Sequence, residues 1–376
     1  MEKYRVGIVG ATGMVGQRFI SLLKDHPWFE VNCVAASARS AGKTYREAVG
    51  ERWAFSWEIP EKVAGMTVVD AADIDEVSKH VDFVFCAVDM KKDEIRALEE
   101  AYAKHEIPVV SNNSACRGIE DVPMVVPEIN ADHLAVIEAQ KKRLGTKNGF
   151  IAVKPNCSIQ SYVPALTPLL DFEPEKVSVC TYQAISGAGK TFKTWPEMVD
   201  NVIPYIGGED EKSENEPLKL WGHVEDGKIV NATLPVISAQ CLRVACSDGH
   251  MAAVSVSFKK KPTIEQIKER WANYETEAQR LELPSAPKPF LQYFEDPSRP
   301  QTRLDRDFQN GFGVSIGRLR EDKLFDYRFV FEKQDRSVAG SQASVYFSLR
   351  SFEDFRRNKS LQCFFRDLPK SFMVLA

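Results

Sequence analysis

The sequence predicts an α/β protein whose first half forms a parallel, doubly wound sheet. Three observations predict this fold class. A short apolar run, Tyr4 to Val9, is followed by closely spaced glycines and then by helical spacing from Gln17 to Leu23. Further strand-like runs, Val81 to Val88 and Ile107 to Val110, alternate with helical stretches such as Lys92 to His105, which is typical of βα units. The chain has 376 residues, 44% of them hydrophobic, which is enough for two domains with separate cores.

The composition argues against several functional classes. The formal net charge is −4 and no basic stripe is present, so we expect no nucleic-acid partner. No apolar segment of 18 residues exists, and Met1 to Arg5 leads directly into a strand pattern, so we expect neither a membrane span nor a signal peptide. The eight cysteines form no CxxC pair, which argues against disulfides and against a metal site. We therefore expect a globular, cytoplasmic protein with free thiols and no metal.

A glycine-rich turn joins the first predicted strand to the first predicted helix and reads GATGMVG at 10–16. Glycines permit a tight turn and the close approach of a pyrophosphate, whose charge is met by the helix N-terminus. The spacing G-x-x-G-x-x-G differs from the commoner G-x-G-x-x-G, so the prediction depends on the position of the turn after a first strand. The predicted cofactor contacts in this turn are Gly10, Thr12, Gly13, Met14 and Val15.

The segment after the second predicted strand, Val31 to Ala36, indicates which dinucleotide binds. Dinucleotide folds specific for NAD usually place Asp or Glu there to bind the ribose, but this chain has Ser37-Ala38-Arg39-Ser40. No carboxylate is present to repel a 2′-phosphate, and an arginine is available to pair with it. We therefore expect NADP as the cofactor, with contacts from Ser37, Arg39 and Ser40. The alternative is that Arg39 is only a solvated loop residue.

Cys157 is the predicted nucleophile. It lies in the segment KPNCS at 154–158, behind a proline that ends the apolar run from Phe150 to Val153. A cysteine between a strand end and a helix start can have its thiolate stabilised by the helix dipole and by backbone N–H groups. Four other cysteines lie inside apolar runs and are interpreted as buried hydrophobic residues: Cys33, Cys86, Cys180 and Cys241.

Arg243 and His250 are candidates for a carboxylate clamp and an acid/base. His250 lies between a Ser-Asp-Gly turn and the predicted strand Met251 to Val256, although a plain strand-edge residue remains an alternative. The other histidines lie in charged or polar surroundings and are interpreted as surface or loop residues: His26, His80, His105, His133 and His223.

A second phosphate-binding pattern, A-x-x-x-x-G-K-T, runs from Ala184 to Thr191. It would indicate a nucleotide triphosphatase, which is a different functional class. However, Pro196 follows five residues after Thr191, where the helix that supports such a loop should run. We therefore disfavour this interpretation.

In their order and spacing, these motifs resemble the aspartate-semialdehyde dehydrogenase family over roughly residues 1–330. The matching segments are GATGMVG at 10–16, SARSAGK at 37–43, SNNSACR at 111–117, VPEIN at 126–130, KPNCS at 154–158, TYQAISGAG at 181–189, the run from Asn201 to Gly222, and Arg243 with His250.

The resemblance implies a domain organisation. A Rossmann-type NADP-binding domain is expected over 1–150, and an α+β catalytic and dimerisation domain with a large mixed sheet over 151–331. A homodimer or homotetramer is expected. The resemblance stops after Phe331, so residues 332–376 are expected to form an atypical C-terminal segment, for which docking on the first domain is one arrangement. An altered reading frame near position 331 and a lineage-specific ending are both open explanations.

The resemblance also implies a reaction. Members of the family convert L-aspartyl 4-phosphate and NADPH into L-aspartate 4-semialdehyde and inorganic phosphate, through a cysteine thioester, in the biosynthesis of lysine, threonine and methionine. By resemblance, Cys157 is the nucleophile, His250 the acid/base and Gln183 a group that orients the substrate. Arg243 would hold the substrate carboxylate.

Further site residues follow from the same resemblance. Arg117 and Lys219 would bind the phosphate, and Asn112 would contact the substrate. The E-x-x-K pair of the family maps onto Glu216 and Lys219, although Glu209 and Lys212 form a second such pair. The implied cofactor contacts in the second half are Ser186 and Gly187.

Two competing functions remain open. A paralogous reductase that acts on an acyl-CoA, such as malonyl-CoA, would keep the cysteine, the histidine and the NADP site but change the substrate arginines. A non-catalytic NADP-binding protein would bind the cofactor without any turnover that depends on a thiol.

Overall fold

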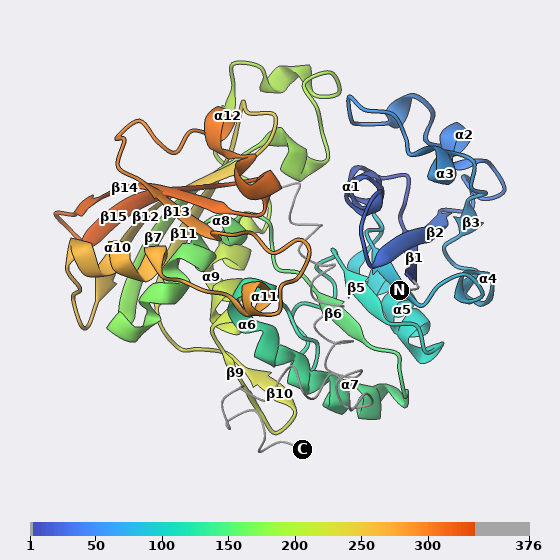
Figure 1. Ribbon diagram of the computed structural model, residues 1–376, viewed down its shortest axis with the longest axis horizontal. Coiled ribbons are helices and arrows are strands. Elements are labelled where there is room, and N and C mark those ends of the chain that lie inside the picture. Colours follow the sequence, from blue (N-terminus) through green and yellow to red (C-terminus); the bar gives the residue numbers. More distant parts are fainter. Residues whose placement is uncertain (1–2, 335–376) are drawn as a thin grey trace.

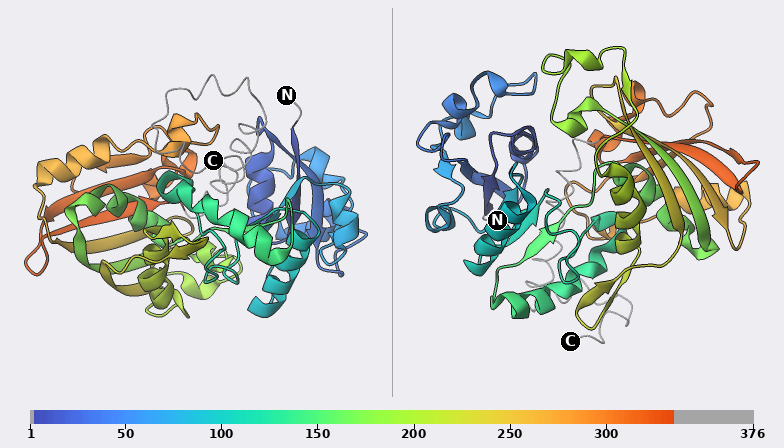
Figure 2. Two further views of the ribbon diagram at one scale, coloured as in Figure 1. Left: turned by 90° about the horizontal axis from the view of Figure 1, so that it is seen from below. Right: turned by 180° about the vertical axis from the view of Figure 1, so that it is seen from behind.

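The computed structural model describes residues 3–334, which form two sheets joined by helices (Figure 1). The two sheets lie side by side, and the views of Figure 2 show this arrangement from two other directions. The expected C-terminal segment 332–376 lies, apart from its first three residues, outside the described residues. Within residues 3–334, no helix combines the length and the apolar character that crossing a membrane requires.

The first sheet has six strands in the order β3-β2-β1-β4-β5-β6, and every pair is parallel. This is the order of a Rossmann-type doubly wound sheet, as expected. The strands are β1 (Tyr4–Val9), β2 (Phe29–Ala36), β3 (Val69–Asp70), β4 (Phe83–Cys86), β5 (Val109–Ser111) and β6 (Ile151–Val153). The connecting helices are α1 (Met14–Leu23), α2 (Tyr45–Val49), α3 (Glu61–Ala64), α4 (Ile74–Ser78), α5 (Lys92–Lys104), α6 (Pro127–Asn130) and α7 (Ile137–Leu144).

Both faces of this sheet are covered because successive strand residues point to opposite sides. On one face, Phe19 of α1 packs in a core with Val6 and Ile8 of β1. On the other face, Tyr102 of α5 packs in a second core with Val84 of β4. Strand β6 (Ile151–Val153) completes this sheet, so the last strand of the sheet lies just beyond the expected first domain of 1–150.

The turn between β1 and α1 requires its first and third glycines for different reasons. Gly10 has a φ of 89°, and a Cβ there would lie 2.3 Å from the carbonyl oxygen of Ala87, in the loop after β4. A Cβ on Gly16 would lie 2.4 Å from the carbonyl oxygen of Gly10. These glycines therefore let the helix and the neighbouring loop approach the end of β1 closely.

The second sheet has seven strands in the order β13-β14-β15-β12-β7-β11-β8 and mixes parallel with antiparallel pairs. The expected large mixed sheet is thus confirmed. Its strands are β7 (Pro174–Gln183), β8 (Val202–Ile203), β11 (Val236–Val244), β12 (His250–Phe258), β13 (Leu291–Phe294), β14 (Val314–Glu321) and β15 (Tyr327–Lys333); a separate hairpin pairs β9 (His223–Glu225) with β10 (Lys228–Val230). The helices of this half are α8 (Ile159–Leu166), α9 (Glu209–Leu220), α10 (Ile264–Ala272), α11 (Glu277–Arg280) and α12 (Thr302–Asp305).

Helix α8 is a buried element that directly follows the segment containing Cys157. All eight of its residues are buried, and it contacts β12, β14 and β15. Trp271 of α10 closes the same core, since its indole N–H donates to the carbonyl of Ala165 at 2.7 Å and its ring lies edge-on to Phe329. The residues that precede α8 are therefore held by a tightly packed support.

In the second half the sequence predicts a helical segment over 264–281 and a long loop over 284–300, and both predictions are wrong. A continuous helix from 264 to 281 is interrupted at residues 273–276, because the hydroxyl of Thr276 caps a new helix by accepting from the N–H of Gln279. The stretch 284–300 is not a plain loop, since it contains β13.

Two histidines interpreted as surface residues are buried. His26 stacks on the ring of Phe29. His133 contacts the side chain of Asn130 and the carbonyl of Gly222 through its two ring nitrogens. The polar neighbours in the sequence concealed these tertiary contacts.

Candidate active site

The sulfur of Cys157 lies 3.3 Å from Nε2 of His250. Cys157 immediately precedes the cap residue of α8, and His250 is the first residue of β12, so two separate elements bring the pair together. Nδ1 of His250 lies 3.0 Å from the backbone N–H of Ala184, which donates to it. In its neutral form His250 therefore carries its proton on Nε2, and that proton faces the sulfur.

The surroundings of Cys157 favour its thiolate. Burial opposes ionisation, but the charge of His250, the hydrogen bond from His250 and the charge of Lys154 outweigh it and hold the pKa of the thiol below its usual value. Cys157 is a partly exposed residue. By contrast, burial raises the pKa of Cys33, Cys86 and Cys241, and these side chains lie in the interior as expected.

Three neighbouring strands place His250, Gln183 and Arg243 in one row. In the registers of the sheet, Gln183 of β7 lies opposite His250 of β12 on one side and opposite Arg243 of β11 on the other. All three side chains are buried. A Cβ on Gly187 would lie 2.9 Å from Nη1 of Arg243 and 3.0 Å from Nε2 of His250, so the loop after β7 lies directly against both. The row and the loop therefore meet at His250, which contacts the sulfur of Cys157.

Helix α9 contributes a stripe of alternating charges to the same region. Spacings of three, four and three residues place these side chains on one face of the helix: Glu209, Lys212, Glu216 and Lys219.

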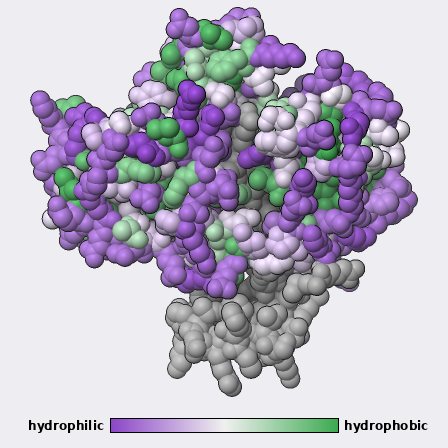
Figure 3. Space-filling model, turned by 45° about the horizontal axis from the view of Figure 1, so that its top comes forward, coloured by the Kyte–Doolittle hydropathy of each residue, from purple (hydrophilic) through white to green (hydrophobic). Residues whose placement is uncertain are grey.

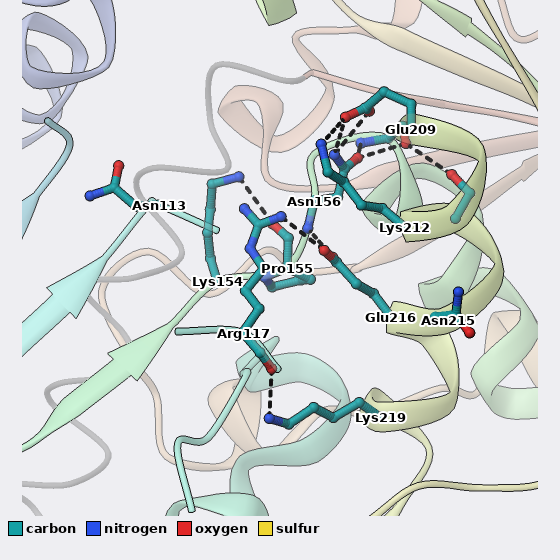
Figure 4. Close-up of polar contacts among 12 residues, drawn as sticks. Asn113, Arg117, Lys154, Pro155, Asn156, Glu209, Lys212, Asn215, Glu216 and Lys219 are labelled. Atoms are coloured by element: carbon teal, nitrogen blue, oxygen red, sulfur yellow. Dashed lines mark hydrogen bonds and ion pairs between the residues drawn. The ribbon is translucent and has the colours of Figure 1, made fainter. Parts of the chain in front are cut away.

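Glu209 links this helix to the row of strands and to the nucleophile segment (Figure 4). Its two oxygens accept from Nδ2 of Asn156, each at 2.9 Å, and one of them accepts from Nε2 of Gln183 at 3.2 Å. Nζ of Lys212 pairs with it at 2.7 Å. Burial opposes ionisation of Glu209, but Lys212 and the two amides outweigh it, and the pKa of Glu209 lies below its usual value.

Glu216 holds Arg117. Nη1 of Arg117 donates to Glu216 at 2.9 Å, and Nη2 donates to the carbonyl of Asn112 at 3.2 Å. The second oxygen of Glu216 accepts from the backbone N–H of Asn156. Nε of Arg117 is buried and has no hydrogen-bond partner within residues 3–334. Through Glu216, the guanidinium from the loop after β5 is thus linked to the backbone of Asn156, the residue before Cys157.

Lys219 is occupied by the backbone. Its ammonium donates to the carbonyls of Arg117 at 2.7 Å, Ile119 at 2.7 Å and Val122 at 3.0 Å. Burial lowers the pKa of Lys219 to about 8. Because an ammonium has three N–H donors, this arrangement uses all of them within the protein.

The turn after β1 fits a dinucleotide pyrophosphate. Gly13 is exposed, and a Cβ there would meet nothing closer than 3.5 Å, so the backbone can be approached from outside. Helix α1 begins after Gly13 with no side-chain cap and no acidic residue in its first turn. An uncapped helix start without carboxylates suits a bound phosphate. Thr12, Met14 and Val15 are partly exposed beside Gly13.

The remaining expected cofactor contacts lie in two places. Ser37 and Arg39 are exposed and Ser40 is partly exposed, directly after the carboxyl end of β2. Ser186 and Gly187 lie in the loop after β7, next to His250.

One side chain of the cluster, that of Lys154, was assigned no role from the sequence. For Asn156 the sequence offers a role as a donor to the oxyanion that forms at the acyl carbon. Nothing in the KPNCS segment shows that Asn156 meets Glu209 or that Lys154 is buried. Glu209 with Lys212 was weighed only as the alternative E-x-x-K pair. The three-residue spacing recurs in α9, and only the tertiary contacts separate the two pairs.

Family models match most of the chain. The model described as "Semialdehyde dehydrogenase, NAD binding domain" matches residues 5–137. The model described as "Semialdehyde dehydrogenase, dimerisation domain" matches residues 166–331.

Curated relatives give the same result. An aspartate-semialdehyde dehydrogenase of Archaeoglobus fulgidus is 43% identical over 322 residues, which cover 85% of this chain and 90% of that protein. One of Schizosaccharomyces pombe is 44% identical over 332 residues, which cover 87% of this chain and 91% of that protein.

Solved structures share the architecture. The crystal structure of aspartate semialdehyde dehydrogenase with NADP from Candida albicans matches with a TM-score of 0.84 and 36% identity, over 93% of this chain and 99% of that chain. The structure of aspartate semialdehyde dehydrogenase II complexed with ASA from Vibrio cholerae matches with a TM-score of 0.69 over 93% of this chain and 99% of that chain; at 22% identity this match shows the fold alone.

Proposed function

The chain belongs to the aspartate-semialdehyde dehydrogenase family, and from this membership and the Cys157–His250 contact we propose how it works. Cys157 takes the acyl group of L-aspartyl 4-phosphate, and reduction of the resulting thioester gives L-aspartate 4-semialdehyde. The observation that carries this proposal is the 3.3 Å approach of Nε2 of His250 to the sulfur of Cys157, a partly exposed residue whose thiol has a lowered pKa.

The chemistry begins with bond exchange at the acyl carbon. The Cys157 thiolate forms a C–S bond to that carbon, the C–O bond to phosphate breaks, and inorganic phosphate leaves with the electron pair. NADPH, when bound, supplies the hydride that reduces the thioester. His250 holds a proton on Nε2 beside the sulfur, from which it can protonate the oxyanion that forms at the acyl carbon. His250 takes that proton back as the C–S bond breaks with its electron pair on the sulfur, which frees the aldehyde and restores the Cys157 thiolate.

Arg243 suits the carboxylate of the substrate. Its guanidinium is buried beside His250, with Nη1 fixed by the carbonyl of Ala184 at 2.6 Å. A planar guanidinium binds a carboxylate through two parallel hydrogen bonds, which fixes the distance from the substrate carboxylate to the reacting carbon. Gln183, between Arg243 and His250, is suited to orient the acyl group.

We assign the E-x-x-K pair to Glu209 and Lys212 and not to Glu216 and Lys219. Glu209 contacts Gln183 and Asn156, which adjoin the sulfur, whereas Lys219 supports the carbonyls of the loop that carries Arg117. Glu216 then positions the Arg117 guanidinium, which binds phosphate, and Asn112 supports that guanidinium through its backbone carbonyl.

The cofactor in this proposal is NADP. The open turn at Gly13 and the uncapped start of α1 would hold the pyrophosphate. Arg39, at the carboxyl end of β2, would pair with the 2′-phosphate, with Ser37 and Ser40 beside it. Ser186 and Gly187 would border the nicotinamide next to His250.

A homodimer or homotetramer is supported by the surface of the second half. The face of β7 and β11 opposite the catalytic row exposes Tyr182 and Val236. Between β7 and α9 the chain exposes Val199, Val202 and Tyr205, and Figure 3 shows a group of hydrophobic residues at the top of the molecule, where this segment lies. Exposed apolar groups of this kind suit a subunit interface. A cytoplasmic location is part of the proposal, because the Cys157 nucleophile must stay reduced.

The test is the reaction run in its oxidative direction. The protein is mixed with L-aspartate 4-semialdehyde and NADP, with inorganic phosphate or coenzyme A as the acyl acceptor, and NADPH absorbance is followed. Reduction of NADP that requires phosphate supports the proposal. Reduction that requires coenzyme A would indicate the acyl-CoA reductase, and NADP binding without turnover would indicate a non-catalytic protein.

A further inference from the structure

Lys154 is a buried cation without a carboxylate partner. Only 7% of the residue is exposed, and its Nζ donates to one acceptor, the carbonyl of Pro155 at 3.1 Å. No carboxylate lies within ion-pair distance of Nζ among residues 3–334. A buried ammonium with one neutral partner is costly unless an anion comes to it.

Arg117 lies beside Lys154 and also has a hydrogen-bond donor that no described residue uses. Figure 4 shows the ammonium of Lys154 next to the guanidinium of Arg117, and burial together with the charge of Arg117 lowers the pKa of Lys154 to about 8. Nε of Arg117 is buried without a hydrogen-bond partner in the described part of the chain. Two enclosed cations side by side, one of them with an unpartnered donor, form a site for a multivalent anion.

The other cations of the cluster already have partners within the protein. Lys212 pairs with Glu209 at 2.7 Å, and all three donors of Lys219 point to carbonyls. Arg117 itself shares its charge with Glu216. Lys154 is therefore the buried lysine of the cluster that keeps N–H donors for an incoming anion.

We propose that Lys154, together with Arg117, binds the phosphoryl oxygens of the substrate and of the departing phosphate beside Cys157. This inference rests on the proposed function and adds a phosphate-binding residue to it. The Cys157 thiolate alone does not account for Lys154, because its single negative charge already receives the hydrogen bond of His250. A phosphoryl group brings up to two charges and several acceptor oxygens.

The test measures the phosphate dependence of NADP reduction by the wild type, by Lys154→Met and by Lys154→Gln. Loss of a charge-assisted contact should raise the KM for phosphate by about tenfold or more. The KM for the semialdehyde should change less than twofold. Lys141→Met is the matched control, because Lys141 is equally buried, in α7, and should leave the KM for phosphate unchanged.

A second readout does not need turnover. Inorganic phosphate should protect Cys157 of the wild type from iodoacetamide, and Lys154→Met should need about tenfold more phosphate for the same protection. The inference is overturned if the wild type uses phosphate but both Lys154→Met and Lys154→Gln keep the wild-type KM for phosphate and the wild-type protection of Cys157. A wild type without phosphate-dependent turnover overturns the proposed function instead. Were both variants to misfold, a crystal structure of the wild type with inorganic phosphate would decide: phosphate within hydrogen-bond distance of Nζ of Lys154 would support the inference, and phosphate bound away from Nζ would overturn it.

Discussion

The turn after β1 takes its residues from one stretch, 10–16, whereas the cluster around Cys157 takes them from the loop after β5, the start of α8, three strands and α9. In the turn, close contacts with the backbone determine the residue type. At position 10, for example, a Cβ would clash with the carbonyl of Ala87, so the residue is glycine. In the cluster, side-chain contacts over long sequence separations set the geometry, as between Cys157 and His250. Changes in the turn should therefore act on folding and cofactor binding, and changes in the cluster on the reaction.

The largest effect is expected for Cys157→Ala. Removal of the thiol that we propose carries the acyl intermediate should lower kcat by about ten-thousandfold or more. The side chain is small and partly exposed, so the midpoint of thermal unfolding and NADP binding should stay as in the wild type. Ordinary turnover by this variant would show that the cluster is not the reaction centre. The measurement is the phosphate-dependent formation of NADPH.

The next effect is expected for His250→Asn. The asparagine oxygen can still accept from the N–H of Ala184, but the group that faces the sulfur is lost. We expect kcat to fall by about a hundredfold to a thousandfold. The pKa of Cys157 should rise, because the charge and the hydrogen bond of His250 lower it in the wild type. The rate of alkylation by iodoacetamide should therefore shift to higher pH, and an unchanged pH profile would contradict the assigned contact.

The sequence predicted the two regions unequally. Residues 4–9 were expected as a strand and form β1 with the same bounds, because a local apolar run and a glycine stop are enough to specify them. Cys157, His250 and Arg243 were also singled out from local patterns. The contacts that join the parts of the cluster were not predicted. Glu209 and Asn156, for example, lie 53 positions apart in the sequence and meet in the tertiary fold, in which α9 packs against β11. The sequence favoured Glu216 and Lys219 as the E-x-x-K pair, whereas the tertiary contacts of Glu209 with Asn156 and Gln183 support our proposal of Glu209 and Lys212.

A smaller effect is expected in the turn, on stability. Gly10→Ala forces a Cβ into a residue with a φ of 89° and into the carbonyl of Ala87, so the free energy of unfolding should fall by about 2 kcal/mol or more. Gly13→Ala meets nothing closer than 3.5 Å and should fold normally while NADP binding weakens. Gly65→Ala is the control, since its Cβ would lie in open space. Denaturant unfolding and cofactor titration check all three, and equal stability of the first two variants would remove the distinction drawn between Gly10 and Gly13.

The smallest effect is expected for Arg39→Ala. Loss of the pairing with the 2′-phosphate should weaken NADP binding by about tenfold and leave NAD binding unchanged, because Arg39 is exposed and supports no other element. The ratio of kcat/KM for the two cofactors measures this change. A wild type that prefers NAD, or a variant that keeps the wild-type ratio, would show that Arg39 is a solvated loop residue.

The thioester on Cys157 is tested directly by mass spectrometry of the protein after incubation with L-aspartyl 4-phosphate in the absence of NADPH. We expect one aspartyl group on the peptide that contains Cys157, released as the semialdehyde when NADPH is added, and no adduct in Cys157→Ala. An active wild-type protein whose acyl group appears on another residue, or on none, would contradict this expectation.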